Sequence, residues 1–262
     1  MIPMMSKCSI EIPNIDSGYR ITLRSLFQGL VILCGLCMVS QVAQAKGAKS
    51  EKSPHSNGGD DQSFFHQITG KPLSQVTSGR NYWDQIYSTE RYIYGTRPAD
   101  FLVEVLDQLR KGLALDIAMG EGRNAVYLAK KGFKVEGVDY SDVAIRKAHR
   151  LAKNHRVAIH AINADLNDYQ IKQNHYDLII NINYLQRSLA PMIKAGLKSG
   201  GFLVFENQTV DQLKNPGGQG INQEYLLKKG ELREMFADLK IIAYRETNDG
   251  KDALASLLAQ KP

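Results

Sequence analysis

The stretch of sequence that decides the fold is ALDIAMGEGRNAVYLAKKGFKVEGVD, residues 114–139. It starts as a short apolar strand, and Gly120 and Gly122 follow where a strand would turn sharply into a helix. The helix pattern ends at Gly132, and a second apolar strand runs up to Asp139. A strand–turn–helix–strand unit of this length predicts two parallel strands whose ligand lies at their carboxyl ends.

Helix and strand patterns alternate along the chain on both sides of this unit. The expected helices cover residues 98–109, 124–131, 142–154, 189–197 and 229–236, and Gly200-Gly201 stops the fourth of them. The expected strands cover residues 114–118, 133–139, 157–164, 176–182, 202–207, 239–245 and 255–260. This alternation predicts an α/β fold, with a mainly parallel sheet and helices on both of its faces.

Residues 1–45 have the pattern of an export signal or an anchor. Basic residues precede an apolar stretch, and Ala43 and Ala45 provide the small side chains that a signal peptidase needs, so cleavage after Ala45 is expected. The expected location is exported or periplasmic, with a cytoplasmic location as the alternative if the true start lies downstream. Membrane contact is expected only if residues 26–45 are retained.

Composition divides the rest of the chain into a flexible linker over residues 46–80, rich in polar residues, and one domain over residues 81–262. The formal net charge is +6, but the Lys and Arg residues are dispersed rather than gathered into blocks, which argues against nucleic acid as a partner. All three cysteines precede residue 40, so the domain can have no disulfide framework, thiol nucleophile or cysteine zinc site. No histidine spacing suggests a metal site.

Carboxylates stand at the ends of three successive strands. Asp116 lies in the first, Asp139 ends the second, and Asp165-Leu166 follows the third. Each has a simpler reading, since Asp139 could cap the next helix and Asp165 could serve a turn. The ordered series instead predicts a nucleoside site, in which Asp139 accepts the ribose hydroxyls and Asp165 and Leu166 contact the adenine.

A dinucleotide is the competing ligand, because residues 120–125 also fit Gly-x-Gly-x-x-Ala. Asp116 argues against it, since a carboxylate there would repel a pyrophosphate. The same carboxylate would attract the positive charge of a sulfonium cofactor with an amino-acid tail.

These residues resemble the motifs of the class I S-adenosylmethionine-dependent methyltransferases, and Gly-Glu-Gly-Arg-Asn with an upstream Tyr-Gly-Thr-Arg-Pro resembles the tellurite-resistance and thiopurine branch. The resemblance covers about residues 82–261 and implies a Rossmann-like seven-stranded sheet of order 3-2-1-4-5-7-6 with an antiparallel last strand. It implies S-adenosylmethionine as the cofactor. The cofactor-binding residues that it implies are Asp116, Ala118, Gly120, Gly122, Asn124, Asp139, Tyr140, Asp165, Leu166 and Asn181. Ala118 and Met119 depart from the family, which often has Gly and Cys there.

Methyl transfer needs alignment of the acceptor more than a dedicated base, so no catalytic residue is assigned. A small-molecule acceptor is expected. The acceptor-side candidates are Tyr82, Trp83, Tyr87, Tyr94, Arg97, Asn183, Tyr184 and Arg187, with the two arginines as possible anion hooks. Residues 181–184 superficially resemble the Asn-Pro-Pro-Tyr motif of DNA amine methyltransferases, but both prolines are absent. A cofactor-binding sensor without catalysis and a dinucleotide-dependent oxidoreductase are the alternatives, and the oligomeric state is left open.

Overall fold

The computed structural model describes residues 80–216, 218 and 221–262. The expectations for residues 1–45 and for the linker up to residue 79 lie outside the described residues. Within the described part, no helix is long and apolar enough to cross a membrane.

A single seven-stranded sheet forms the centre of the described chain, in the order β3-β2-β1-β4-β5-β7-β6. Its strands are β1 (Leu113–Ile117), β2 (Lys134–Asp139), β3 (His160–Asn163), β4 (Tyr176–Ile182), β5 (Leu197–Gln208), β6 (Lys240–Asn248) and β7 (Ala253–Gln260). The pairs among β1 to β5 are parallel, and β7 runs antiparallel to both β5 and β6. The expected strand order and the antiparallel last strand are confirmed.

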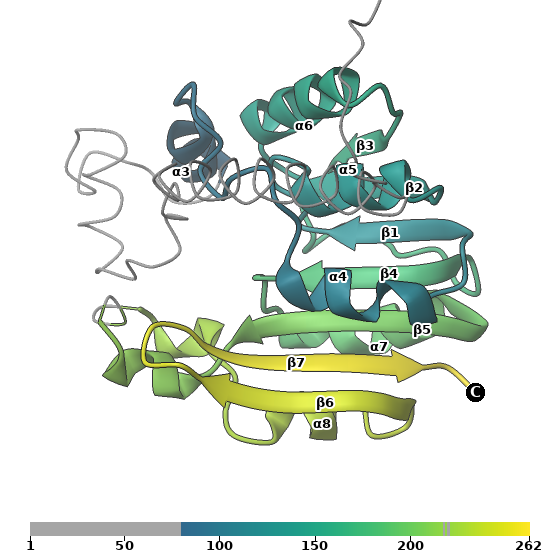
Figure 1. Ribbon diagram of the computed structural model, residues 1–262, viewed down its shortest axis with the longest axis vertical. Coiled ribbons are helices and arrows are strands. Elements are labelled where there is room, and N and C mark those ends of the chain that lie inside the picture. The colour runs from purple at the N-terminus through teal and green to yellow at the C-terminus, as the bar shows by residue number, and fades with distance from the viewer. Residues whose placement is uncertain (1–79, 217, 219–220) are drawn as a thin grey trace, which may run out of the picture. The chain divides into compact units, whose positions relative to one another are not determined.

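Helices cover both faces of this sheet (Figure 1). They are α3 (Arg80–Tyr87), α4 (Asp100–Val105), α5 (Arg123–Lys130), α6 (Asp142–Asn154), α7 (Ala190–Gly196) and α8 (Glu231–Met235). On one face, α4, α5 and α6 bury apolar side chains against the sheet, and on the other face α7 and α8 do so. Two apolar layers therefore hold the sheet between them, which explains why β4 reads as a continuous buried run rather than an alternating one.

Several expected boundaries differ from the structure. The helix expected over residues 98–109 ends as α4 at Val105 and continues as a 3-10 turn, and β3 is shorter than its pattern. The prediction that Gly200-Gly201 stops a helix was wrong, because α7 ends at Gly196 and both glycines lie inside β5. They mark an irregularity in the β4–β5 register, where a Cβ at Gly201 would lie 3.0 Å from the Tyr176 carbonyl oxygen.

Candidate functional site

The candidate site lies at the carboxyl ends of β1, β2 and β4. Because these strands are parallel neighbours, their last residues share one edge of the sheet, with Ile117 paired to both Val138 and Asn181. Asp116, Asp139 and Asn181 are therefore brought together from three different strands. Asp165 follows β3, the next strand outward in the sheet.

The glycine-rich loop between β1 and α5 bends through three left-handed residues: Ala118 with φ 52°, Gly120 with φ 54° and Gly122 with φ 84°. A Cβ at Gly120 would lie 3.1 Å from the Tyr87 hydroxyl oxygen, and one at Gly122 would lie 2.7 Å from the Cβ of Ala148 in α6. From the sequence, both glycines were expected to allow close approach by a ligand. The structure gives Gly122 another reason, which is the packing of the loop against α6.

Both departures from the family pattern fit the structure. Ala118 adopts the left-handed conformation that glycine takes without penalty, and a side chain there costs about 1–2 kcal/mol. Met119 is buried and packs over β2 at Gly137, where a Cβ would lie within 2.1 Å of the Met119 sulfur. The absence of a side chain at Gly137 thus makes room for the larger residue at position 119.

Asp139 is buried and links two loops. Its Oδ2 accepts a hydrogen bond from the Gly120 N–H at 2.8 Å, and its Oδ1 accepts one from the Ser141 N–H at 2.9 Å. Burial raises the pKa of Asp139, and these hydrogen bonds oppose the shift. The cap of α6 is Ser141, whose Oγ accepts from the Ala144 N–H, so Asp139 does not have that role. A carboxylate has about four acceptor positions, so two bonds leave capacity for ribose hydroxyls.

Asp116 and Asn181 carry buried polar atoms that lack partners. Asp116 is 2% exposed and Asn181 is 0% exposed. Among the described residues, none bonds to Oδ2 of Asp116 or to either amide atom of Asn181. Burial raises the pKa of Asp116 to about 8. Since an unsatisfied buried polar group costs about 1–3 kcal/mol, two at neighbouring strand ends indicate a ligand that completes them.

The chemistry of this donor set fits S-adenosylmethionine. The Asp116 carboxylate can neutralise an amino group or a sulfonium, and the Asn181 amide can both donate and accept. Asp139 remains available to hydroxyl groups, as described above. The residues present therefore match a ligand with a cationic tail and a ribose.

Asp165 and Leu166 are placed where the adenine contact was expected, but part of Asp165 is already engaged. Its Oδ1 accepts hydrogen bonds from both the backbone and the side-chain nitrogen of Asn167, each at 2.9 Å. Leu166 is buried in the core against the sheet. Tyr140 is half-buried, and the Arg80 guanidinium lies 5.9 Å from its ring centre. An adenine contact through these residues stays a prediction.

Asn124 has a partner within the protein. Its Oδ1 accepts a hydrogen bond from the Ala99 N–H at 2.9 Å, and the residue is 6% exposed. This bond fixes the start of α4 against α5, so the structure gives Asn124 a positioning role next to the loop.

The aromatic acceptor-side candidates lie in and after α3. The Trp83 and Tyr87 rings are stacked at 5.7 Å, Tyr82 meets Trp83 edge-on at 5.4 Å, and Tyr94 meets Tyr87 edge-on at 6.2 Å. Tyr87 is the residue of this group that reaches the glycine-rich loop, through the contact over Gly120. Trp83 and Tyr87 therefore pack against each other, and Tyr87 also lies beside the loop where the cofactor is expected to bind.

The two arginines expected as anion hooks are placed differently. Arg97 is 90% exposed and contacts Asp100 at 3.4 Å. Arg187 makes a two-pronged contact with Glu231, at 2.5 and 3.0 Å, and also donates to the carbonyl groups of Glu224 and Leu226. Arg187 thus ties the segment before α8 to the turn that follows β4, and four of its five N–H donors are already used within the protein.

Asn183 and Tyr184 follow β4. Asn183 has a φ of 62°, and its N–H donates to the Glu206 carbonyl. The Tyr184 hydroxyl donates to Gln186 at 2.6 Å, and burial raises its pKa to about 12. A left-handed non-glycine residue at this strand end stores local strain, which is a common property of functional loops.

A buried ion pair at the loop was not among the contacts predicted from the sequence. Lys147 of α6 lies 2.5 Å from Glu121, and both side chains are at most 5% exposed. The signal was present in the sequence, because Lys147 falls on the apolar stripe of α6 with Ala144, Ala148 and Leu151. A lysine in such a stripe is almost never buried unless it is paired.

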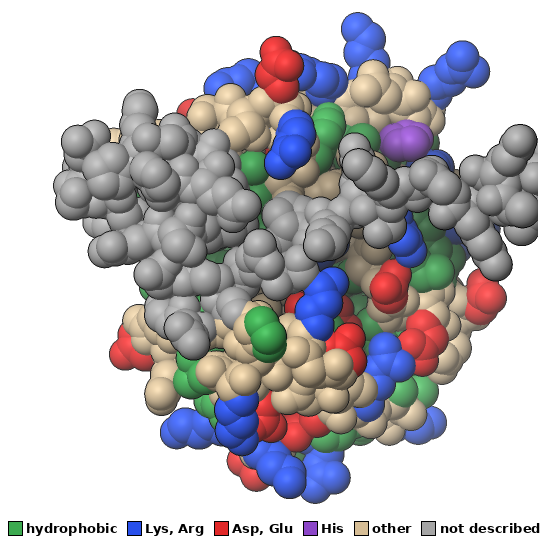
Figure 2. Space-filling model, turned by 60° about the vertical axis from the view of Figure 1, so that its left-hand side comes forward, with side chains coloured by type: hydrophobic (Ala, Val, Ile, Leu, Met, Phe, Trp, Pro, Cys, Tyr) green, Lys and Arg blue, Asp and Glu red, His purple; other side chains and the backbone are tan. Residues whose placement is uncertain are grey.

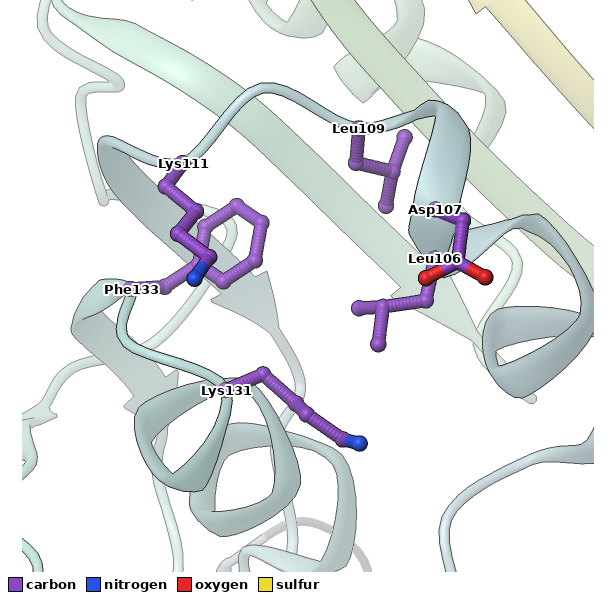
Figure 3. Close-up of a pocket in the computed structure, with 6 residues that line it drawn as sticks. All are labelled: Leu106, Asp107, Leu109, Lys111, Lys131 and Phe133. Carbon is purple, nitrogen blue, oxygen red and sulfur yellow. The ribbon is translucent and has the colours of Figure 1, made fainter.

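A pocket of about 230 Å³ lies at the opposite edge of the sheet, before the amino ends of β1 and β2. Figure 3 shows its apolar floor with two lysine side chains at the rim, and its lining residues are Leu106, Asp107, Leu109, Lys111, Lys131 and Phe133. It shares no residue with the carboxyl-edge site. In the described ranges, no group of three or more His, Cys, Asp or Glu residues could hold a metal ion.

Part of the chain that forms this site is similar to known methyltransferases. Residues 114–201 match the family model described as "Methyltransferase domain". The chain is 26% identical over 140 residues to the "Probable S-adenosyl-L-methionine-dependent methyltransferase TehB" of Haemophilus influenzae, covering 50% of this chain and 47% of that protein. It is 27% identical over 139 residues to "Hemagglutinin 1" of Eikenella corrodens, covering 50% and 45%.

Among solved structures, that of TehB from Haemophilus influenzae aligns with a TM-score of 0.54 at 21% identity, covering 70% of this chain and 67% of that one. This likeness shows the fold. The chain spans about half the length of the curated relatives named above.

Proposed function

We propose that this chain, which carries a class I S-adenosylmethionine-dependent methyltransferase domain of the TehB-like branch, catalyses methyl transfer to a small-molecule acceptor. S-adenosylmethionine is the cofactor. The observation that carries the proposal is the pair of unsatisfied buried side chains, Asp116 and Asn181, beside a left-handed glycine-rich loop.

Different side chains at the carboxyl edge of the sheet bind the charged part and the ribose of the cofactor. The bound cofactor supplies a methyl carbon that is already activated by a sulfonium. Asp116 balances the positive charge of the cofactor, and Asp139 orients the ribose while its bonds to Gly120 and Ser141 hold it in place. Residues 80–94 beside the loop and the segment after β4 exclude water and set the direction of approach, which is what an in-line displacement requires.

The nature of the acceptor is inferred from what surrounds this edge. Arg187 is engaged with Glu231, and Arg97 stands exposed beside Asp100, so neither arginine is a strong candidate for an anion hook. Figure 2 shows acidic and basic side chains interspersed on the face that it displays, which supports a small molecule over a nucleic acid. Aromatic side chains, Trp83, Tyr87 and Tyr94, favour an acceptor with an apolar or polarisable body.

Release of S-adenosylhomocysteine tests the proposal. The full chain would be incubated with S-adenosylmethionine and a panel of thiols, amines and oxyanions, with Asp139→Ala as the site variant and Lys194→Met, in an exposed ion pair with Asp238, as the matched control. Acceptor-dependent release by the native chain and the control, but not by the site variant, is expected. Tight binding without release for any acceptor would favour a sensor, and calorimetry that finds preference for NAD would favour an oxidoreductase.

We also propose that residues 1–45 direct export, with cleavage after Ala45. Amino-terminal sequencing of the protein recovered from periplasmic and cytoplasmic fractions tests this. A mature protein that begins at Lys46 in the periplasm is expected, and a cytoplasmic protein that retains Ala43 and Ala45 would contradict it.

A further inference from the structure

Residues 80–94, here called the strap, contact the glycine-rich loop and are attached to α6. Apolar side chains of the strap pack with Ala144 of α6, and Ile86, Tyr87 and Ile93 are buried in this contact. At the start of α6, Oδ1 of Asp84 accepts hydrogen bonds from the Ser141 hydroxyl and the Val143 N–H. The strap is therefore fixed at the first turn of α6.

Lys147 makes the second attachment, one turn further along α6. Its ammonium group donates to three strap carbonyl oxygens, those of Tyr87 at 3.2 Å, Thr89 at 2.9 Å and Arg91 at 2.6 Å. It also pairs with Glu121 at 2.5 Å. Lys147, which makes these four contacts, is only 4% exposed. One buried cation therefore joins α6, the strap and the glycine-rich loop.

Glu121 completes the connection from the loop side. Its Oε2 accepts a hydrogen bond from the Tyr94 N–H at 3.3 Å, so the loop holds the far end of the strap as well. Burial raises the pKa of Glu121, and Lys147 opposes that shift. Removal of one partner from a buried ion pair leaves an uncompensated charge, so this group of contacts is sensitive to single substitutions.

The consequence of these attachments is the position of the Tyr87 hydroxyl. The residue is 5% exposed, its ring stacks on Trp83, and its oxygen lies over Gly120. Among the residues that the structure describes, none makes a hydrogen bond to this hydroxyl. A buried phenol usually has a partner, and this one faces the loop that holds the cofactor.

Arg123 is the first residue of α5, directly after the same loop. In the described part of the chain its guanidinium makes one long hydrogen bond, 3.5 Å to the Tyr94 carbonyl, and no carboxylate is in ion-pair contact with it. Burial lowers the pKa of Arg123, and the nearby charges of Glu206 and Asp116 oppose that shift. A guanidinium with five donors and one weak partner is a ready ligand for a carboxylate.

We propose that the Tyr87 hydroxyl and the Arg123 guanidinium together receive the carboxylate of the cofactor's amino-acid tail, and that Lys147 is a positioning residue that holds Tyr87 for this contact. The inference rests on the proposed function, because it assigns a part of the same cofactor site. The amino group of the tail goes to Asp116, so the two charges of the zwitterion have separate partners in the protein. Lys147 acts through Tyr87 and does not itself touch the cofactor.

Two ligands that differ in the tail test this inference by titration calorimetry on the full chain. S-adenosylhomocysteine carries the amino acid, and 5′-methylthioadenosine keeps the adenosine and the thioether without it. Tyr87→Phe and Lys147→Met are each expected to weaken S-adenosylhomocysteine about tenfold, the effect of one lost hydrogen bond to a charged group. Both variants should bind 5′-methylthioadenosine as the native chain does.

The double variant and the controls separate positioning from general damage. Tyr87→Phe combined with Lys147→Met should bind no more weakly than Lys147→Met alone, and Lys147→Arg should recover part of the loss. Tyr176→Phe, which removes a buried hydroxyl contact with Glu136 at the far end of β4, should change neither affinity. Equal losses for both ligands, additive losses in the double variant, or unchanged binding by Tyr87→Phe would each overturn the inference.

Binding of S-adenosylhomocysteine by the native chain separates a failure of the proposed function from a failure of this inference alone. If it fails to bind S-adenosylhomocysteine, the proposed function fails, and the inference fails with it. If it binds S-adenosylhomocysteine while the variants behave in one of the contrary ways above, the inference alone is wrong. Because Tyr87→Phe removes a single oxygen atom, this variant keeps the test decisive even if Lys147→Met does not fold.

Discussion

Replacing Gly122 with alanine perturbs the glycine-rich loop in two separable ways. The residue has a φ of 84°, and the left-handed conformation costs an alanine about 1–2 kcal/mol. The new Cβ would also lie 2.7 Å from the Cβ and 3.1 Å from the Cα of Ala148, and overpacking of this kind costs about 1–3 kcal/mol. The free energy of unfolding should fall by about 2–5 kcal/mol in total.

Gly132 provides the matched control for this substitution. It has a φ of 92°, but a Cβ there would approach no atom closer than 3.7 Å, so Gly132→Ala should cost only the conformational part, about 1–2 kcal/mol. Both substitutions remove the same flexibility from the unfolded chain, so that contribution cancels in the comparison.

Urea denaturation in the absence of cofactor measures both variants, and the Ala148→Gly background tests the contact itself. In that background the methyl group that meets the new side chain is gone, so Gly122→Ala should regain about 1–3 kcal/mol, as a coupling energy in a double-mutant cycle. If Gly122→Ala costs no more than Gly132→Ala, or if the cycle shows no coupling, the reasoning that α6 demands a glycine at this position is refuted.

Three further outcomes are expected. The pKa of Asp116 is raised from 3.8 to about 8, so between these pH values the native state keeps a proton that the unfolded state releases. The free energy of unfolding should therefore fall as the pH rises from about 4 to 8. Asp116→Asn should flatten this slope when the free energy of unfolding is measured by urea titration at each pH. Asp139→Ala should weaken S-adenosylhomocysteine by about 1–3 kcal/mol in calorimetry, and unchanged affinity would exclude its ribose role. Arg187→Met should lower the free energy of unfolding by about 1 kcal/mol and leave cofactor affinity unchanged, whereas a selective loss of acceptor turnover in kinetic assays would give Arg187 back its acceptor role.

The fold could be predicted from the sequence because its signals are local. Residues 114–139 contain a whole strand–turn–helix–strand unit, and α6 and β4 have the bounds that their patterns predict. The error at Gly200 and Gly201 has a physical cause. Glycine permits both a helix end and an irregular strand, and only the partner strand β4 decides between them.

The site was less predictable because its contacts are distant in sequence. The location of Asp116 and Asp139 at one edge of the sheet was predicted from their positions at strand ends. The engagement of Arg187 by Glu231 spans 44 residues, and the contact of Lys147 with Tyr87 spans 60. A local pattern could indicate that Lys147 is buried, but not which groups either side chain contacts. The resemblance to a family supplied the cofactor, but it could not show which arginine has unused donors.

The attachment of the strap to α6 also affects how the chain can fold as it is made. The strap leaves the ribosome before Lys147, which follows it by 56–60 residues, and synthesis at about 5–20 residues per second makes that interval roughly 3–12 seconds. During this time Trp83, Tyr87 and Ile93 have no α6 to pack against. The aromatic side chains of the strap therefore wait for their packing partner until α6 has been made, and during that interval they form an apolar surface that a chaperone could bind.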